Sequence, residues 1–421
     1  MAHAAIEERL VIGAILSTIP MYFVGGLYVL GPVLGWLLFA LVCLRFLHSE
    51  TFYIPPLVLV WGGCALTLLI ALLVAHADYD LGLPKTIKSG VGWAKGWALF
   101  ALFLGAGMTL SIRPQPLAHA VCWVCAMTIV FLCLSLIALP FIKGHLYTSP
   151  LSIIGGAGSE YFEIKLFGMN PETGMPRWSF FAPWAPAAGL VACLYFAIAW
   201  HAPNSPIKLI GMTGALLMII FCQSRVAWVT LPLVMSLLLL SQINLGPGHI
   251  VMVAIAVTLA ALSAPDSLEY LQSISDQLKN ARPDSTRVRA ALEQIALDRG
   301  LREAPVWGHG IVERGPHLVQ YMPIGTHHTW LGLLFLKGLV GVAAFALMLI
   351  SLLCASIVSI VKGKSPASLL AVILPLLIYT MTENLEMLVY LFWPAIVYIG
   401  AQLKSQRTQT ETTEQAQDYA V

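Results

Sequence analysis

Long apolar runs follow one another along this chain and constrain its fold more than any other feature. An α-helix needs ~20 apolar residues to cross a bilayer. About twelve runs approach or exceed that length, and they cover 9–24, 27–47, 54–76, 91–112, 118–142, 183–201, 206–222, 226–243, 248–265, 329–360, 366–382 and 385–403. Because 58% of the 421 residues are hydrophobic and only 10% are charged, a water-soluble globular fold is excluded. The sequence predicts an all-α polytopic membrane protein.

The basic residues of the short loops indicate on which side of the membrane each loop lies. An even number of spans puts both ends of the chain on one side, and cytoplasmic loops are enriched in Lys and Arg. The basic residues on the side of the two ends are Arg9, Arg45, Arg113, Lys208, Lys362, Lys364, Lys404 and Arg407, and those opposite are Lys85, Lys88 and Arg225. We therefore expect the long loops 143–182 and 266–328 to lie outside the cytoplasm.

These predictions divide the chain into four parts. Residues 1–265 hold the first nine spans and the smaller outer loop, and 266–328 form the large outer loop. The last three spans occupy 329–403, and 404–421 form a polar cytoplasmic tail.

Charge and cysteine usage exclude two further classes of protein. The formal net charge is only +2, with basic residues spread over many loops, so no nucleic-acid-binding surface is indicated. All eight cysteines lie within predicted spans, so the outer loops have no disulfide framework. Cys122 and Cys125 have the spacing of a redox or zinc pair, but no second ligand pair lies nearby. We interpret them as two small apolar residues in a helix.

The large outer loop is the main water-facing segment, with 15 of the 44 charged residues, and its pattern is helical. Apolar residues recur at three- and four-residue spacing, as one face of a helix requires. The two stripes are Leu268, Leu271, Ile274 and Leu278, then Val288, Ala291, Leu292 and Ile295. We predict two amphipathic helices over the membrane domain, the second of which ends at Gly300.

Two arginines stand next to the membrane surface. Ser224-Arg225 joins two apolar runs with almost no loop between them, and Arg177 immediately precedes another run. An arginine in such a place is costly to desolvate without a partner. It acts either as an interfacial anchor or as a ligand for a diphosphate, whose oxygens match the guanidinium fork.

Two more arginines lie on the second loop helix. Arg289 has Glu293 four residues further on and is predicted to form an ordinary surface pair. Arg287 lies one turn before Ala291, at the edge of the apolar stripe. It can bind an anion there, or simply pair along the helix.

Four short segments together resemble the O-antigen ligase and polymerase superfamily. Residues 325–331, Gly-Thr-His-His-Thr-Trp-Leu, are followed by Gly-Leu-Val-Gly at 338–341, and they resemble the family's His-Asn-x-Tyr-Leu and Gly-Leu-x-Gly signature. Ser224-Arg225, the Arg287 helix and Pro-Val-Trp-Gly-His-Gly at 305–310 resemble its other elements, in the same order. The resemblance covers about 140 to 345. His328 replaces the usual Asn and Trp330 the usual Tyr.

The resemblance implies a GT-C-like membrane glycosyltransferase in the bacterial inner membrane, with its outer loops and active site in the periplasm. Its donor would be a glycan on undecaprenyl diphosphate, and in the ligase branch its acceptor would be a sugar hydroxyl of lipid A core. Membrane lipids would surround it, and no cofactor is implied. The motif places the catalytic role on His327, with His328 in support.

The chemistry of such a transfer suits these residues. A hydroxyl that attacks an anomeric carbon must lose its proton, and neutral histidine, here His327, can accept it near neutral pH. The departing diphosphate needs positive charge, which Arg225, Arg287 and Arg177 can supply in place of a metal ion.

Other functions remain open from the sequence. O-antigen polymerase and protein O-oligosaccharyltransferase share the chemistry and differ in the acceptor. A lipid-linked sugar transporter also suits twelve spans, but it should carry charged or broken helices in both halves, whereas Lys337 is the main charge within a span. Asp78-Tyr79-Asp80, near His76, has the spacing of a metal-binding pair, although a short turn explains it equally well. We favour the metal-independent ligase.

Overall fold

The computed structural model describes residues 5–48, 53–154, 158–170, 174–242, 283–319, 321–325, 328–363 and 366–418. Three predictions lie outside the described residues: the span 248–265, the loop helix around 268–278, and His327. The statements below concern the described residues.

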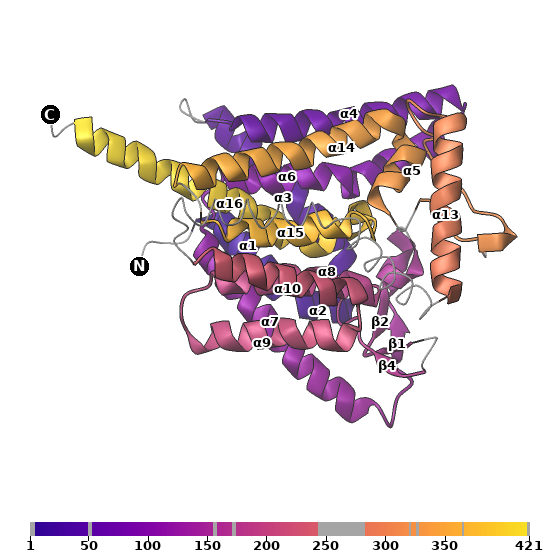
Figure 1. Cartoon of the computed structure of the whole chain (residues 1–421), viewed down its shortest axis with the longest axis horizontal. Coiled ribbons are helices and arrows are strands. Elements are labelled where there is room, and N and C mark those ends of the chain that lie inside the picture. Colours follow the sequence, from indigo (N-terminus) through magenta and orange to yellow (C-terminus); the bar gives the residue numbers. More distant parts are fainter. Residues whose placement is uncertain are drawn as a thin grey trace, which may run out of the picture.

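Most helices run side by side along one direction and form a bundle (Figure 1). They are α1 (Ile6–Leu16), α2 (Thr18–Val24), α3 (Leu27–His48), α4 (Pro56–Asp78), α6 (Trp97–Thr109), α7 (Pro114–Ala138), α8 (Ala185–Trp200), α9 (Pro206–Cys222), α10 (Arg225–Leu240), α14 (Thr329–Val361), α15 (Leu369–Tyr379) and α16 (Leu385–Asp418). Six stretches are long and apolar enough to cross a membrane: Leu27–His48, Pro56–Asp78, Leu83–Thr109, Pro114–Ala138, Thr329–Val361 and Leu385–Lys404. The prediction of a helical multi-pass membrane protein is confirmed, while the number twelve stays a prediction.

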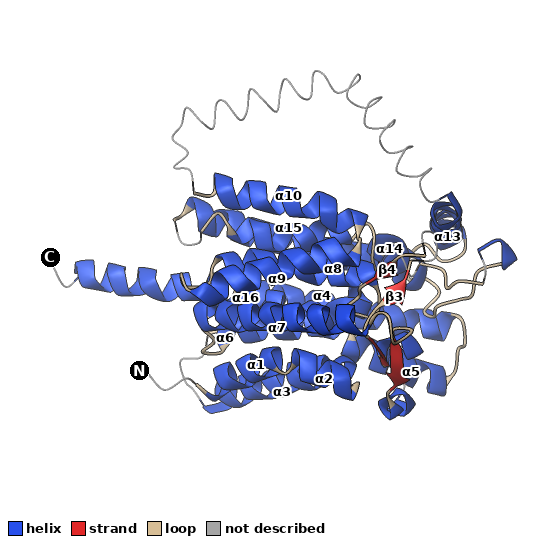
Figure 2. Ribbon diagram, turned by 90° about the horizontal axis from the view of Figure 1, so that it is seen from below, coloured by secondary structure: helices blue, strands red, loops and turns tan. Residues whose placement is uncertain are grey.

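The two ends of the bundle differ in composition. Both termini lie at one end, where Glu8 of α1 binds Arg113 at 2.6 Å and Lys404 of α16 donates to the carbonyl oxygen of Thr109 at 2.8 Å. The opposite end carries the strands and α13 (Pro283–Arg302), and Figure 2 shows this arrangement from a second direction. We call this second end the loop end.

The segment 143–182, which we predicted to lie outside the cytoplasm, contains short strands and turns that the sequence did not predict. Strand β1 (His145–Thr148) pairs antiparallel with β2 (Glu163–Lys165), and β3 (Gly168–Met169) pairs with β4 (Pro176–Arg177). The 3₁₀ turns η1 (Pro150–Ile154) and η2 (Ser159–Tyr161) lie between β1 and β2. Strands this short have too few residues to show an alternating pattern.

Two predicted spans are broken. The run 9–24 forms α1 and α2, with Ser17 between them. The run 91–112 begins within α5 (Leu83–Lys95), which ends at Gly96, where φ is −120° and ψ is −95°. The helix that continues through the bundle, α6, starts only at Trp97.

Small residues bring neighbouring helices into close contact. A Cβ on Gly107 of α6 would lie 2.4 Å from the carbonyl oxygen of Val397 on α16. Cys122 and Cys125 are buried and free, and they pack on Gly211 and Gly214 of α9. Close approach through small residues is typical of membrane helices. The two cysteines therefore behave as small packing residues, as predicted.

Candidate active site

Helix α14 is interrupted at Gly338, and a segment of the large loop fills the gap. Gly338 has φ 61° and ψ −163°, which breaks the helical hydrogen bonds. The freed amides of Leu339 and Val340 donate to the carbonyl oxygens of Pro305 and Val306 at 2.8 and 3.2 Å. A Cβ on Gly338 would lie 2.2 Å from the Val306 oxygen. The 305–310 and 338–341 segments that the sequence singled out therefore form one interlocked structure.

The start of α14 carries the histidine segment. His328 caps the helix, since its Nδ1 accepts a hydrogen bond from the amide of Leu331 at 3.4 Å. Burial lowers the pKa of His328, which favours the neutral ring. Because Nδ1 accepts here, the ring proton of the neutral form belongs on Nε2. His328 is thus used as a helix cap, and His327 lies outside the described residues.

The turn between α15 and α16 holds the histidine segment in place. Thr329 Oγ1 donates to the carbonyl oxygen of Glu383 at 2.6 Å and accepts from the amide of Leu385 at 3.2 Å. Trp330 Nε1 donates to Thr380 Oγ1 at 3.0 Å. The last helix pair thereby fixes the entry of α14.

Glu383 is a buried acidic residue of this region that sequence reasoning did not single out. Its side chain is 3% exposed, and its Oε2 accepts a hydrogen bond from Trp184 Nε1 at 2.8 Å. Burial raises the pKa of Glu383 to about 7, against the opposing charges of Arg289 and Arg177 and the Trp184 hydrogen bond. The available signal was an acidic residue between two apolar spans, which is rare without a functional reason.

The Ser224-Arg225 segment forms the start of α10. Ser224 is buried and accepts a hydrogen bond from the amide of Ala227 at 3.4 Å, so it caps the helix. Arg225, the first helical residue, is partly exposed. Arg177 donates from Nε to the carbonyl oxygen of Cys222 at 2.8 Å and from Nη2 to that of Gln223 at 3.2 Å. Arg177 therefore sits against the end of α9, directly beside this turn.

Gly189 of α8 packs against both the Ser224-Arg225 turn and the end of α15, just before Glu383. A Cβ on Gly189 of α8 would lie 2.9 Å from both Ser224 Cβ and Tyr379 Oη. Tyr379 ends α15, and its carbonyl oxygen accepts from the amide of Glu383 at 2.9 Å. Arg177 thus contacts the turn that precedes Ser224, and Ser224 and Tyr379 both pack on Gly189. Tyr379 is hydrogen-bonded to Glu383, which in turn is hydrogen-bonded to Thr329. We call the residues Arg177, Ser224, Arg225, His328, Thr329 and Glu383 the loop-end site.

The two arginines of helix α13 lie on different faces of the helix. Val288 and Leu292 are buried against α14, in a small apolar cluster with Phe335. Arg287 lies on the exposed side of the helix, whereas Arg289 is partly buried. The charge of Arg289 acts on Glu383 as well as on Glu293. Arg289 is therefore close enough to the loop-end site for its charge to act on Glu383, in addition to its effect on Glu293.

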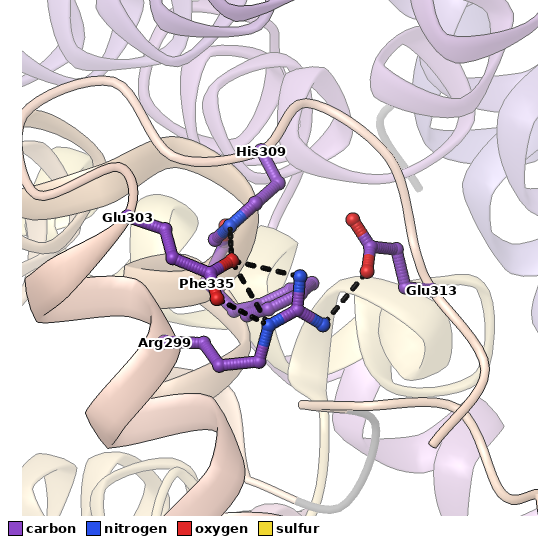
Figure 3. A network of polar contacts seen from close by, with 5 residues as sticks. All are labelled: Arg299, Glu303, His309, Glu313 and Phe335. Carbon is purple, nitrogen blue, oxygen red and sulfur yellow. Dashed lines mark hydrogen bonds and ion pairs between the residues drawn. The ribbon is translucent and has the colours of Figure 1, made fainter. Parts of the chain in front are cut away.

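A polar network fixes the second half of the large loop (Figure 3). Arg299 binds Glu303 at 2.8 Å and Glu313 at 2.7 Å, and His309 Nε2 lies 2.9 Å from Glu303 Oε2. The hydrogen bonds from Arg299 and His309 lower the pKa of Glu303 to about 2. His309 also stacks on Phe335 of α14 at 4.3 Å. The loop is thus attached to α14 by this network and by the 305–310 segment.

Asp78 is the last residue of α4 and Asp80 lies on the turn that follows, and both are exposed. His76, nearby, is buried, and both of its ring nitrogens are hydrogen-bonded. Nδ1 lies 3.1 Å from Thr86 Oγ1, and Nε2 lies 3.2 Å from the carbonyl oxygen of Gly310. Among the described residues no three His, Cys, Asp or Glu side chains come together as metal ligands would.

The fold and the loop-end site define a multi-pass membrane protein with buried and partly buried charged groups at one end of its bundle. Residues 210–346, less than half of the chain, match the family model described as O-antigen ligase, so this part of the chain is similar to that family. The family indicates an enzyme of glycosyl transfer that acts on lipid-linked glycans. No curated protein matches the chain. The resemblance expected from the four short segments is confirmed.

Proposed function

We propose that this protein is an O-antigen ligase. It would transfer a glycan from undecaprenyl diphosphate to a sugar hydroxyl of lipid A core, on the periplasmic side of the bacterial inner membrane. The observation that carries the proposal is the loop-end site, where the Ser224-Arg225 turn, the buried Glu383 and the histidine segment meet. Thr329 Oγ1 donates a hydrogen bond to the carbonyl oxygen of Glu383 at 2.6 Å there.

The histidine segment supplies the base in this proposal. His328 is occupied as the cap of α14 through Nδ1, which leaves its neighbour His327 as the residue that accepts the acceptor hydroxyl's proton. The new glycosidic bond forms as the bond from the anomeric carbon to the diphosphate breaks. The diphosphate leaves with the electron pair of that bond.

The arginines stabilise the departing diphosphate. Arg225 and Arg177 lie at the turn before α10, whose amino end adds a partial positive charge. A third arginine comes from α13. The sequence singles out Arg287, and Arg289 is added because it is partly buried and its charge acts on Glu383. We further propose that Glu383 holds Arg289 and Arg177 in place before the donor binds. These charges stand in for a metal ion.

One observation favours a different class, a transporter of lipid-linked sugars. Helix α14 is broken at Gly338, and Lys337 beside the break is buried. Broken helices with buried charge are typical of transport sites. Here, however, the 305–310 segment satisfies the freed amides of Leu339 and Val340, which suits a fixed structure better than a moving gate.

The lipopolysaccharide of a strain that lacks the protein tests the proposal. A ligase predicts uncapped lipid A core together with accumulated polymer on undecaprenyl diphosphate. Core that carries a single repeat unit would indicate a polymerase instead. Unchanged lipopolysaccharide with loss of glycosylated protein would indicate a protein O-oligosaccharyltransferase, and intermediates trapped on the cytoplasmic side would indicate a transporter.

A further inference from the structure

Helix α5 lies at the loop end and has none of its side chains buried. Its position is nevertheless defined by contacts on one face. Thr86 Oγ1 lies 3.1 Å from His76 Nδ1 near the end of α4, and Trp93 Nε1 donates to the carbonyl oxygen of Ala65, about three turns earlier on α4, at 2.8 Å. The helix therefore starts beside the outer end of α4 and runs back along it.

The other two faces of α5 have opposite character. Leu83, Ile87 and Val91 recur at four-residue spacing and are 72%, 58% and 50% exposed. Lys85 and Lys88 are exposed on a separate face and form no ion pair within the described part of the chain, including with Asp78 at the end of α4 and Asp80 of the turn after it. A helix with one face on protein, one apolar and one basic is suited to the boundary between lipid tails and head groups.

The lipid-facing surface of α4 supports this assignment. Leu66 and Ile70 on α4 are 56% and 52% exposed, as the stripe of α5 is, and α4 is long and apolar enough to span the membrane. Because α5 is hydrogen-bonded to α4, a bilayer that surrounds α4 would place acyl chains next to the apolar stripe of α5. Its lysines lie at the outer end, where phosphates are found.

We propose that α5 lies in the outer leaflet of the bilayer beside α4, with Leu83, Ile87 and Val91 among the acyl chains and Lys85 and Lys88 on the phosphates of anionic lipids. The proposal is independent of the transfer chemistry. It makes α5 a lipid contact that reaches the large loop through His76, which bonds both Thr86 and the carbonyl oxygen of Gly310.

Fluorescence quenching in vesicles tests where the stripe lies. The full-length protein, with Cys43, Cys133 and Cys354 replaced by alanine, receives Ile87→Cys or, as a matched control at the exposed end of α4, Asp78→Cys. The new cysteine is labelled with a fluorophore. We expect phosphatidylcholine with brominated acyl chains to quench the Ile87→Cys label and aqueous iodide to quench the Asp78→Cys label. Iodide quenching of both labels would overturn the proposal. Protection of the Ile87→Cys label from both quenchers would also overturn it, since a second copy or another protein would then cover the stripe.

The choice of lipid tests the lysines. Brominated phosphatidylglycerol and brominated phosphatidylcholine are compared at equal amounts in unbrominated vesicles. With both lysines present, we expect the anionic lipid to be enriched at the label by at least about threefold, because each lysine near a surface attracts it. Lys85→Gln with Lys88→Gln should remove the enrichment. Equal quenching by the two lipids in the unmutated helix, or enrichment that survives the double substitution, would refute the role of the lysines.

Discussion

At the scale of single residues, the loop-end site assigns different tasks to side chains that look alike in the sequence. His328 is engaged by the amide of Leu331, and Arg177 by two carbonyl oxygens of the α9 turn. Arg225 and Arg289 are partly exposed. Neighbouring histidines and neighbouring arginines should therefore respond differently to substitution, and the first two predictions use this contrast.

The first prediction separates the two histidines. His327→Ala should lower transfer at least about 100-fold, as expected for loss of a general base. His328→Ala should cost less, because it removes a helix cap. The measurement is ligation by membranes with matched amounts of each variant, and the pattern is wrong if His328→Ala is inactive while His327→Ala keeps its activity.

The second prediction separates the two arginines of α13. Lysine keeps the charge but cannot reproduce the two-pronged hydrogen bonding of arginine. We expect Arg289→Lys to lose more activity than Arg287→Lys, because only Arg289 is partly buried and acts on Glu383. Arg225→Lys should be impaired as well. The same ligation assay applies. Full activity in Arg289→Lys together with loss in Arg287→Lys would show that Arg287, as the sequence predicted, binds the diphosphate.

The third prediction concerns the ionisation of Glu383. Its folded pKa of about 7 lies above its ordinary value of 4.5, so the folded protein loses stability as pH rises between these values. Above about pH 7, Glu383→Gln removes the cost of a buried charge, at most about 3 kcal/mol, and its amide oxygen can still accept from Trp184. The midpoint of thermal unfolding should therefore rise near pH 8 and change little near pH 4.5. An equal shift at both pH values would contradict the buried ionisation.

At the scale of elements, the helix α13 was predicted with its apolar stripe, while the short strands and the break of α14 were not. Val288 and Leu292 show the helical period in the sequence itself. The φ of 61° at Gly338 depends on Pro305 and Val306, which lie some thirty residues earlier in the chain. A contact of that kind leaves no local pattern, although the glycine motifs on both sides of it were recognised.

The fourth prediction tests this interlocked element. Gly338→Ala would force a side chain into a positive φ and against the Val306 carbonyl oxygen. We expect a loss of stability of about 2 kcal/mol or more, together with loss of transfer. Gly62→Ala on α4 is the matched control, since nothing lies within 4 Å of its Cβ. Comparable thermal midpoints for the two variants would show that the break tolerates a side chain.

At the scale of the whole molecule, apolar composition predicted the membrane bundle because lipid excludes unpaired backbone groups and leaves helices as the spanning form. It could not predict which polar groups meet at the loop end. Arg177 precedes α8, Arg225 begins α10, Arg289 lies on α13 and Glu383 precedes α16. Residues so far apart in the chain are brought together only by the packing of the bundle, as at Gly189.

The last prediction follows from this gathering of charge. Because the positive groups come from three separate elements of the protein, we expect transfer by the purified enzyme to keep its rate in excess chelator. Asp78→Asn and Asp80→Asn should also be active, since both acids are exposed at the end of α4 and the turn after it, and no third ligand joins them among the described residues. A collapse of the rate in chelator that magnesium or manganese restores would contradict the proposed role of the arginines. If either asparagine variant then failed to recover, the turn after α4 would be the metal site.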